Sequence, residues 1–583
     1  MNLLKLIVIG LLLVLAVCPV SAQDEEPGGV IIQTGNLSSA ATLNPLLAGD
    51  AQTMELVNFL FPWFLNANVA EGVFSDYDPP YATGGIVDTW EIDETGTVYT
   101  FHLREGLTWN DGDPIDAADV LYTWHVIQAG AEGVLNTPLS FVIDPTGQSG
   151  ILDVTAVDDY TVRVTFAAPE CTMLGYASVL SPLPSHVLPA DLSQFEDSPE
   201  ILHPTVTQGM FNFIAQIPAE QISLGVNPDW FDAPEEMGDL AGYILRSVPD
   251  ATMALEQFLA GEVNLMNGAL PGRRDELRQL AQDGQLQVAE YTGGNWAYLA
   301  LNYADPENPR DGLDADGNAI DQGHHPIFGD VRVRQAVARG IDMDAIVSAA
   351  LLGEAERMNS FIIPSSWAYN HDLPLIARDL GAASDLLDEA GWTDSDGDGI
   401  REAHGALYAE EGTPLRFSLL VVAGNQAADS AALLIKDQLF EIGVEVDVQS
   451  MDFSQLLAQI DGQTFDSFIL GWSNGWPDDP DATQLFTPAS DVLGGSGYNS
   501  TSWNNPEFTA LNQQAKTVPG CDLAERAALY AEMQRIFQED LPYVPMLTMT
   551  DFYVARNDIA GFAPFPRNLY WNVPSWDVRQ PGP

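Results

Sequence analysis

Lysine is almost absent from this sequence of 583 residues and occurs only at Lys5, Lys436 and Lys516. In total, 22 lysine and arginine residues face 83 aspartate and glutamate residues, which gives a formal net charge of −61. A protein with this excess of negative charge repels phosphate backbones and anionic membrane surfaces. The composition therefore excludes nucleic-acid binding.

Cysteine is also scarce, with three residues in the whole chain. Only Cys171 and Cys521 lie beyond the N-terminal segment. They form either one disulfide or two separate buried thiols, and their distance along the chain does not decide between these. No CxxC pair occurs, which excludes the common kinds of structural zinc site.

Long hydrophobic runs are missing as well. Spanning a bilayer takes roughly 20 apolar residues, and no run in the sequence is that long. The shorter apolar run at residues 6–17 belongs to a secretory pattern, which predicts a signal peptide over residues 1–22 and a mature chain that begins at Gln23. The alternative is a lipid anchor at Cys18, but Val17 stands where such a motif requires a small residue. We expect an exported protein that is periplasmic or associated with the cell surface.

Several catalytic signatures are absent or incomplete. Neither HExxH nor a phosphate-binding loop that ends in lysine occurs. Residues 471–475 read G-x-S-x-G, as in a hydrolase nucleophile elbow, but Pro477 and Pro480 interrupt the helix that should follow. No histidine follows Ser473 to complete the triad in its usual order. A secreted hydrolase is therefore a weak alternative, and we expect no enzyme activity.

One acidic loop is a candidate metal site. Asp394, Asp396, Asp398 and Glu402 occupy positions 1, 3, 5 and 9 of a calcium-type loop, with glycine at position 6. Position 12 is Gly405, where a true EF-hand has a bidentate glutamate. We therefore favour an acidic surface turn, with calcium binding as the alternative, and expect no other cofactor.

The remaining composition is that of a folded chain, since 46% of the residues are hydrophobic and 18% are charged. No internal repeat is visible, which argues against a structural surface-layer protein. Strand patterns occur at residues 30–34, 98–103, 161–166, 298–302, 416–422 and 468–472, and helical patterns at 117–127, 252–261, 331–339, 427–442 and 523–537. Their alternation predicts α/β lobes.

Aromatic residues cluster where predicted strands end in loops. One cluster is formed by Trp296 and Tyr298, and a second by Trp472, Trp476, Tyr498 and Trp503. Loops at strand ends are where a cleft between α/β lobes gathers its ligand-binding groups. The alternative is that these residues belong to the hydrophobic core, as most large aromatic side chains do.

A series of motifs resembles the family 5 extracellular solute-binding proteins, the peptide and nickel binders of ABC importers. The strongest is IVDTWEI at residues 86–92, continued by YTFHLREGLTWNDGDPIDAADV at 99–120. Further matches follow in the order of the family: TLNP at 42–45, VPDA at 248–251, LAGE at 259–262, DVRVRQA at 330–336, NPEF at 505–508 and LPYVP at 541–545. We interpret the segment at 86–120 as scaffold without ligand contacts.

The resemblance implies a large type II periplasmic-binding-protein fold, an α/β fold whose two lobes close on a ligand. The first lobe would comprise residues 23–300, with an extra subdomain at about 75–200, and the second lobe residues 301–540. The C-terminal segment 541–583 would return to the first lobe. The chain is expected to be a monomer that delivers its ligand to the permease subunits of an ABC transporter.

The predicted pocket departs from the family pattern at one position. Peptide binders of the family commonly carry an aspartate three residues after the tryptophan of a GW pair, where it binds the ligand's α-amino group, but Gly475 stands there. A short insertion would move this anchor to Asp478 or Asp479; otherwise the ligand has no free amine. We expect an oligopeptide-like ligand, with an oligosaccharide as the alternative because Trp472, Asn474 and Trp476 suit sugar binding.

Overall fold

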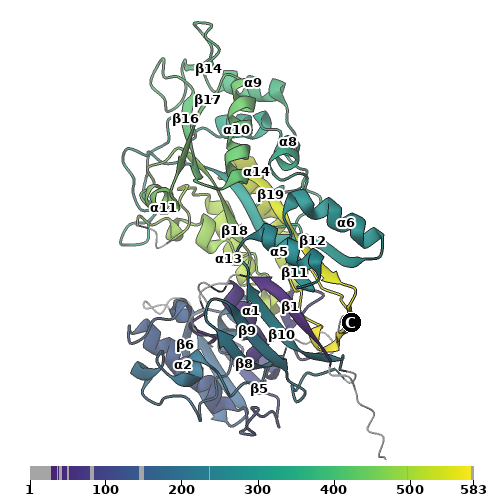
Figure 1. The fold of residues 1–583 in the computed structure, drawn as a ribbon. Coiled ribbons are helices and arrows are strands. Elements are labelled where there is room, and N and C mark those ends of the chain that lie inside the picture. The colour runs from purple at the N-terminus through teal and green to yellow at the C-terminus, as the bar shows by residue number, and fades with distance from the viewer. Residues whose placement is uncertain are drawn as a thin grey trace, which may run out of the picture.

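The structure is a computed structural model that describes residues 28–35, 37, 42–48, 51–78, 84–143, 150–234, 237–494 and 497–579. The predicted signal peptide, Cys18 and Gln23 lie outside the described residues. Two lobes are evident, and the chain passes between them at the middle of the molecule (Figure 1). No helix within the described ranges has both the length and the apolar character that a membrane span requires.

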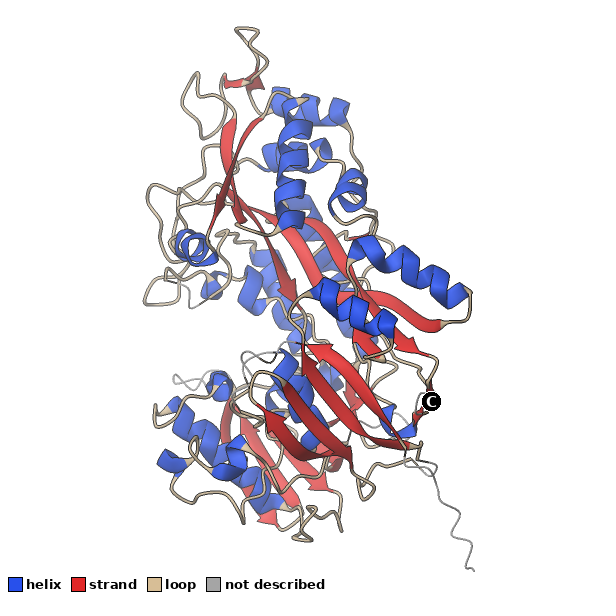
Figure 2. Cartoon of the chain, in the orientation of Figure 1, coloured by secondary structure: helices blue, strands red, loops and turns tan. Residues whose placement is uncertain are grey.

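One large sheet extends through both lobes (Figure 2). Its strand order is β17 (Glu445–Met451), β16 (Arg416–Val422), β18 (Ser467–Ser473), β12 (Leu286–Leu301), β19 (Tyr543–Arg556), β11 (Leu265–Asn267), β1 (Gly29–Gly35), β10 (Leu240–Ser247), β9 (Gln221–Val226) and β8 (Phe211–Ile217), and β13 (Ala355–Arg357) pairs with β19. The two longest strands, β12 and β19, pair with each other in antiparallel fashion and connect the lobes.

Pairing between these strands is irregular between Thr292 and Trp296. The strand pattern predicted at residues 298–302 is therefore only the end of β12, which begins at Leu286. Gly293 and Gly294, at the irregularity, interrupt the apolar alternation from which a strand is recognised. The chain thus crosses between lobes inside β12 and β19, whereas the boundaries predicted at 300 and 540 lie at the lobe-two ends of these strands.

Lobe one contains a second sheet within the predicted extra subdomain. Its order is β4 (Val87–Ile92), β5 (Val98–Leu103), β7 (Thr161–Phe166) and β6 (Ile151–Asp158), and α2 (Ala117–Ala131) packs against it. Buried and half-buried residues alternate along β5, as expected for a strand with one buried face. Small two-stranded pairs join β2 (Asn66–Asn68) to β3 (Val73–Ser75), β14 (Trp392–Thr393) to β15 (Glu402–Ala403) and β20 (Ile559–Ala560) to β21 (Asp577–Val578).

Most of the helices surround these sheets. They are α1 (Ala51–Leu60), α3 (Met173–Ala177), α4 (Pro199–Leu202), α5 (Ala251–Ala260), α6 (Arg274–Gln282), α7 (Val331–Gly340), α8 (Met343–Ala350), α9 (Leu380–Glu389), α10 (Gln426–Phe440), α11 (Phe453–Asp461), α12 (Thr483–Phe486), α13 (Pro506–Lys516) and α14 (Leu523–Asp540). Aspartate side chains cap several N-termini; for example, Asp250 accepts a hydrogen bond from the Met253 amide and Asp330 from that of Arg332. All five predicted helices are confirmed, with ends that differ by at most a few residues.

Each lobe has its own hydrophobic core. One cluster packs α1 and α2 of lobe one against both of its sheets. Two further clusters lie on lobe two, around α7 and α10 and around α13 and α14. A smaller cluster under α5 and α6 packs against β12 and β19. The lobes are therefore separate packing units joined by the long strands.

Candidate functional site

A cavity of about 670 Å³ lies between the two lobes. Lobe one contributes mainly apolar and aromatic side chains, among them Trp63, Phe74, Trp90, Ile92 and Tyr99. Lobe two contributes Trp367, the loop that holds residues 475–479, and Arg526 of α14. The cavity therefore has one apolar wall and one wall that carries charge.

The lobe-two loop is attached to both neighbouring segments. It begins where β18 ends at Ser473, and the Asn474 amide donates a hydrogen bond to the Gly294 carbonyl over 3.0 Å. The Asp478 amide donates to the Gly72 carbonyl of lobe one over 3.1 Å. The half-buried ring of Trp476 lies edge-on to that of Trp63, with centroids 6.0 Å apart. These contacts hold Trp476 and Asp478 at the cavity.

Asp478 has one buried carboxylate oxygen that the described part of the protein leaves without a hydrogen-bond donor. Its residue is 9% exposed, and its Oδ2 atom has no hydrogen-bond partner among the described residues. The Oδ1 atom accepts a hydrogen bond from the Asn474 side chain over 3.3 Å, and the Arg567 guanidinium lies 3.7 Å away. A buried carboxylate oxygen without a donor is costly, so a donor supplied by a ligand would stabilise this arrangement.

Asp479 has a protein partner instead. The Nη2 atom of Arg526 donates to both of its carboxylate oxygens over 2.9 Å. The guanidinium also lies over the Trp367 ring, 5.1 Å from its centroid. Burial raises the pKa of Asp479 even though the charge of Arg526 opposes that shift. Asp479 thus orders the charged wall through an ion pair.

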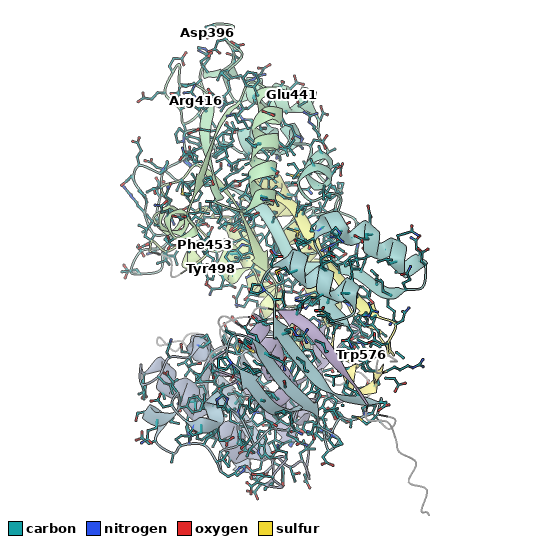
Figure 3. All side chains as sticks on the ribbon, viewed as in Figure 1. Asp396, Arg416, Glu441, Phe453, Tyr498 and Trp576 are labelled. Carbon is teal, nitrogen blue, oxygen red and sulfur yellow. A yellow bond between two sulfur atoms is a disulfide. The ribbon has the colours of Figure 1, made fainter. Side chains whose placement is uncertain are left out.

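The aromatic residues predicted for the pocket are divided among different environments. Trp476 lines the cavity between the lobes, together with Asp478 and Asp479. Trp296 and Trp472 line a second cavity of about 340 Å³. Tyr298, Trp472 and Tyr498 line a third of about 280 Å³, on the lobe-two side where Figure 3 labels Tyr498.

Two of these residues are buried supports for the loop and the sheet. Trp296 is 2% exposed, and its indole nitrogen donates to the Asn474 side chain over 3.0 Å, so that Asn474 holds the loop to β12. Tyr298 stacks on Tyr543, with ring centroids 4.0 Å apart. Trp296 and Tyr298, which the sequence offered as ligand-binding candidates, therefore do not line the cavity between the lobes.

Trp503 lies in the core of lobe two. It is 2% exposed, packs edge-on against Phe508 and donates from its indole nitrogen to Asp540 over 3.0 Å. It lines none of the three cavities. Of the two sequence interpretations for this residue, the structure matches the core.

The sequence interpretation missed the lobe-one wall. Trp90 and Ile92 of β4 and Tyr99 of β5 line the cavity, although the segment that contains them was expected to be scaffold without ligand contacts. The signal was the alternation itself, because Trp90 and Ile92 point to the same face of their strand. The pattern could not show that this face meets lobe two.

The acidic loop lies at the outer tip of lobe two, far from the gap between the lobes, where Asp396 is labelled (Figure 3). One carboxylate oxygen from each of Asp394, Asp396, Asp398 and Glu402 lies within 4.8 Å of the others. The Asp394 carboxylate accepts hydrogen bonds from the Gly397 and Gly399 amides over 2.7 and 3.1 Å. A surface turn accounts for these contacts, and calcium binding remains a prediction.

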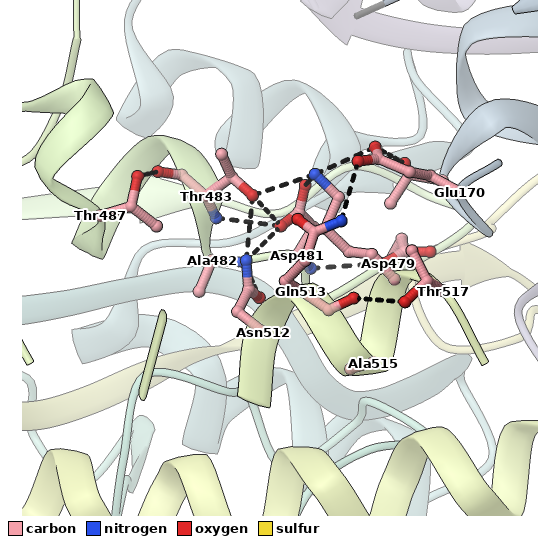
Figure 4. Close-up of polar contacts among 12 residues, drawn as sticks. Glu170, Asp479, Asp481, Ala482, Thr483, Thr487, Asn512, Gln513, Ala515 and Thr517 are labelled. Atoms are coloured by element: carbon pink, nitrogen blue, oxygen red, sulfur yellow. Dashed lines mark hydrogen bonds and ion pairs between the residues drawn. The ribbon is translucent and has the colours of Figure 1, made fainter. Parts of the chain in front are cut away.

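The two cysteines left open by the sequence are joined. Cys171 and Cys521 form a disulfide, and both residues line the cavity. Beside it, Lys516 forms ion pairs with Glu170 over 3.1 Å and with Asp481 over 3.3 Å (Figure 4). Burial opposes the charge of Lys516, but the two carboxylates raise its pKa above the usual value.

Ser473 lacks the setting of a nucleophile elbow. It is the last residue of β18, and the next helix, α12, begins only at Thr483. An elbow requires a strand that turns directly into a helix. The geometry therefore argues against a hydrolase, as the sequence did.

Known proteins match this chain along most of its length. The sequence profile described as "Bacterial extracellular solute-binding proteins, family 5 Middle" matches residues 82–493. The oligopeptide-binding protein AppA of Bacillus subtilis is 24% identical over 571 residues, which cover 95% of this chain and 93% of that protein. The dipeptide-binding protein of Escherichia coli is 24% identical over 522 residues, which cover 84% of this chain and 85% of that protein.

The fold matches solved structures to the same extent. The structure of AppA from Bacillus subtilis in complex with a nonapeptide superposes with a TM-score of 0.67 at 22% identity, and the match covers 95% of this chain and 99% of the other. Two-lobed, non-enzymatic binding proteins for transported solutes make up the family. The chain belongs to family 5 of the bacterial extracellular solute-binding proteins.

Proposed function

We propose that this protein binds a short peptide with a free amino terminus in the cavity between its lobes and delivers it to the permease of an ABC transporter. The observation that carries the proposal is the Oδ2 atom of Asp478, which is buried without a donor beside the cavity. A ligand ammonium would supply a charge-assisted hydrogen bond there. Oligopeptide-binding and dipeptide-binding relatives support the same ligand class.

The charges that line the cavity also favour an amine over a free carboxylate. Asp478 and Asp479 are acidic, and Arg526 is the single basic residue among those that line the cavity. Since Arg526 is already paired with Asp479, it offers little to a second carboxylate. The ligand's carboxyl end would therefore lie toward solvent, or the ligand would carry net positive charge.

An isothermal titration with the peptide Ala-Phe-Ala and its N-acetylated form tests this function. We expect binding of the free-amine peptide and at least about tenfold weaker binding of the acetylated one, because an ammonium-carboxylate hydrogen bond is worth about 1.5–3 kcal/mol. Equal affinities for the two peptides would contradict the amine site. Failure of both to bind would contradict the ligand class.

An oligosaccharide is the second candidate, and the aromatic lining favours it. Trp63, Trp90, Trp367 and Trp476 all face the cavity, and flat apolar ring surfaces pack well against sugar rings. The buried carboxylate of Asp478 favours the peptide, because a neutral sugar compensates its charge less well. Maltotriose in the same titration distinguishes the two ligands.

The remaining steps of this function are also proposals. The protein would be exported, with cleavage before Gln23 and without an acyl chain at Cys18, and would act as a monomer. Intact-mass analysis of the secreted protein tests the cleavage, and a diacylglyceryl group on Cys18 would overturn it. Uptake of a labelled peptide by cells with and without the matching permease genes tests delivery.

A further inference from the structure

The disulfide between Cys171 and Cys521 joins the two lobes. Cys171 lies between β7 and α3 of lobe one, and the neighbouring Met173 is part of the core of that lobe. Cys521 lies between α13 and α14, whose residues Ala515 and Tyr530 belong to a core of lobe two. Among the described residues, the other covalent paths between the lobes run along the chain through β12 and β19.

Polar contacts between the lobes surround the disulfide. The Cys171 amide donates a hydrogen bond to the Lys516 carbonyl over 2.6 Å. The Lys516 ammonium pairs with Glu170 of lobe one and Asp481 of lobe two, and its side chain is only 9% exposed (Figure 4). Residues of both lobes therefore form polar contacts beside the disulfide.

The disulfide also forms part of the cavity wall. Cys171 and Thr172 of lobe one and Gly520 and Cys521 of lobe two all line the cavity. Lobes that open as rigid bodies about a hinge must separate most at the points farthest from that hinge. The disulfide in the cavity wall limits this separation, because its two sulfur atoms must stay bonded.

We propose that the Cys171–Cys521 disulfide is a covalent latch that keeps the lobes closed around the binding cavity, and that its cleavage allows them to open. The control of ligand exchange by the disulfide rests on the proposed function. The restraint on lobe opening does not depend on that function. With the latch intact, ligand would enter and leave only through small twisting motions of the lobes. With the latch open, they would move about β12 and β19 alone.

The cleavage is an ordinary thiol–disulfide exchange with a dithiol reductant. A thiolate of the dithiol attacks the sulfur of Cys521, which leaves Cys171 as a thiol after it gains a proton. The second thiol then displaces the sulfur of Cys521 from the mixed disulfide, so that the protein ends with two thiols and the reductant with one disulfide.

Access and backbone geometry favour attack at Cys521. Cys171 is 7% exposed, whereas Cys521 is half-buried and follows the exposed Gly520. The φ angles of Gly520 and Cys521 are 71° and 54°, and a residue other than glycine in this left-handed region is strained. Release of the disulfide lets Cys521 leave that conformation.

The test is small-angle scattering of the ligand-free protein in three forms: oxidised wild type, wild type reduced with dithiothreitol, and the variant Cys171→Ser/Cys521→Ser. We expect a larger radius of gyration for the reduced protein and the variant than for the oxidised protein. Equal radii in all three forms would overturn the latch. So would a non-reducing peptide map in which the peptides that contain Cys171 and Cys521 are not linked.

A second readout addresses ligand exchange. Stopped-flow tryptophan fluorescence with Ala-Phe-Ala should show association and dissociation about tenfold slower in the oxidised protein than in the reduced one. If the oxidised and reduced proteins differ in radius of gyration but bind and release the peptide at equal rates, the disulfide does not control ligand exchange. If the peptide does not bind in any form, the proposed function fails while the scattering result still decides the latch.

Two controls separate the disulfide from its surroundings. Lys516→Met removes the adjacent ion pairs but keeps the disulfide, so that variant should retain the smaller radius when oxidised. Circular dichroism before and after reduction shows whether both lobes remain folded. A reduced wild-type protein that keeps its secondary structure provides the test even if the double variant folds poorly.

Discussion

The two walls of the cavity differ in chemistry. Lobe one presents mainly apolar rings, including Trp63, Phe74 and Trp90, whereas lobe two presents Asp478 and the pair of Asp479 with Arg526. Apolar surface stabilises any ligand roughly in proportion to the area that it buries. Charged groups discriminate, because a ligand that fails to pair with them leaves a buried charge unsatisfied. The comparison suggests that lobe one supplies affinity and lobe two supplies selectivity.

The largest expected effect is on stability, and it should distinguish a core tryptophan of lobe two from a pocket tryptophan of the same lobe. Trp503→Ala should lower the free energy of unfolding by about 3–5 kcal/mol, because it leaves a cavity in a packed core. Trp476→Ala should weaken ligand binding by about 1–3 kcal/mol with little loss of stability. Urea denaturation and peptide titration of both variants measure this. Full affinity and a collapsed melting temperature for Trp476→Ala would contradict its place in the pocket.

Loss of charge at Asp478 comes next. Asp478→Asn should weaken binding of Ala-Phe-Ala about tenfold to a hundredfold and leave the N-acetylated peptide unaffected, because only the free amine uses the charge. Asp479→Asn is the matched control. Since both oxygens of Asp479 are paired with Arg526, that variant should lose stability and still distinguish the two peptides. The opposite pattern would make Asp479 the anchor.

A substitution on the lobe-one wall should weaken binding of the free and the N-acetylated peptide equally. Trp90→Ala should weaken binding of the free and the acetylated peptide by the same factor, about fivefold, because it removes apolar contact area and no charge. Titration of both peptides against the variant measures the two factors. A change in their ratio would show that lobe one also contributes to selectivity.

The last effect concerns stability and not binding, through a carboxyl group of lobe one. Burial raises the pKa of Glu55 to about 7, from an ordinary value of 4.5, although Tyr570 and Tyr243 donate hydrogen bonds that oppose the shift. Because the folded state holds the proton more tightly, this stability is fully present below pH 4.5 and is lost as pH rises through about 7. The loss should reach at most about 3 kcal/mol, because each unit of difference between the two pKa values corresponds to about 1.4 kcal/mol.

The variant Glu55→Gln isolates this contribution. Its melting temperature relative to wild type should rise between pH 4.5 and 7, because only the wild type loses the contribution over that range. A difference between the two proteins that stays constant with pH would contradict a raised pKa for Glu55.

The sequence by itself determined the family, the α/β character and most individual elements. The signature at residues 86–120 and the motifs that follow it in order identify the family, and local apolar periodicity located segments such as β5 and α14. The loop after β18 was also recognisable, because an apolar strand precedes it and Pro477 and Pro480 lie within it. Each of these signals is formed by residues that are close in the sequence, so it can be recognised without knowing how the chain folds.

The tertiary structure alone decided which of these residues share an environment. Asp478 and Asp479 are neighbours in the sequence, but Arg526 reaches only Asp479 to form an ion pair, and it comes from a helix 47 residues further on. Trp476 and Trp503 belong to the same aromatic cluster in the sequence, yet one lines the cavity and the other fills a core. Cys171 and Cys521 meet across the two lobes although 350 residues separate them. The physical reason is that burial, pairing and desolvation depend on the segments that pack around a side chain, and no local pattern contains that information.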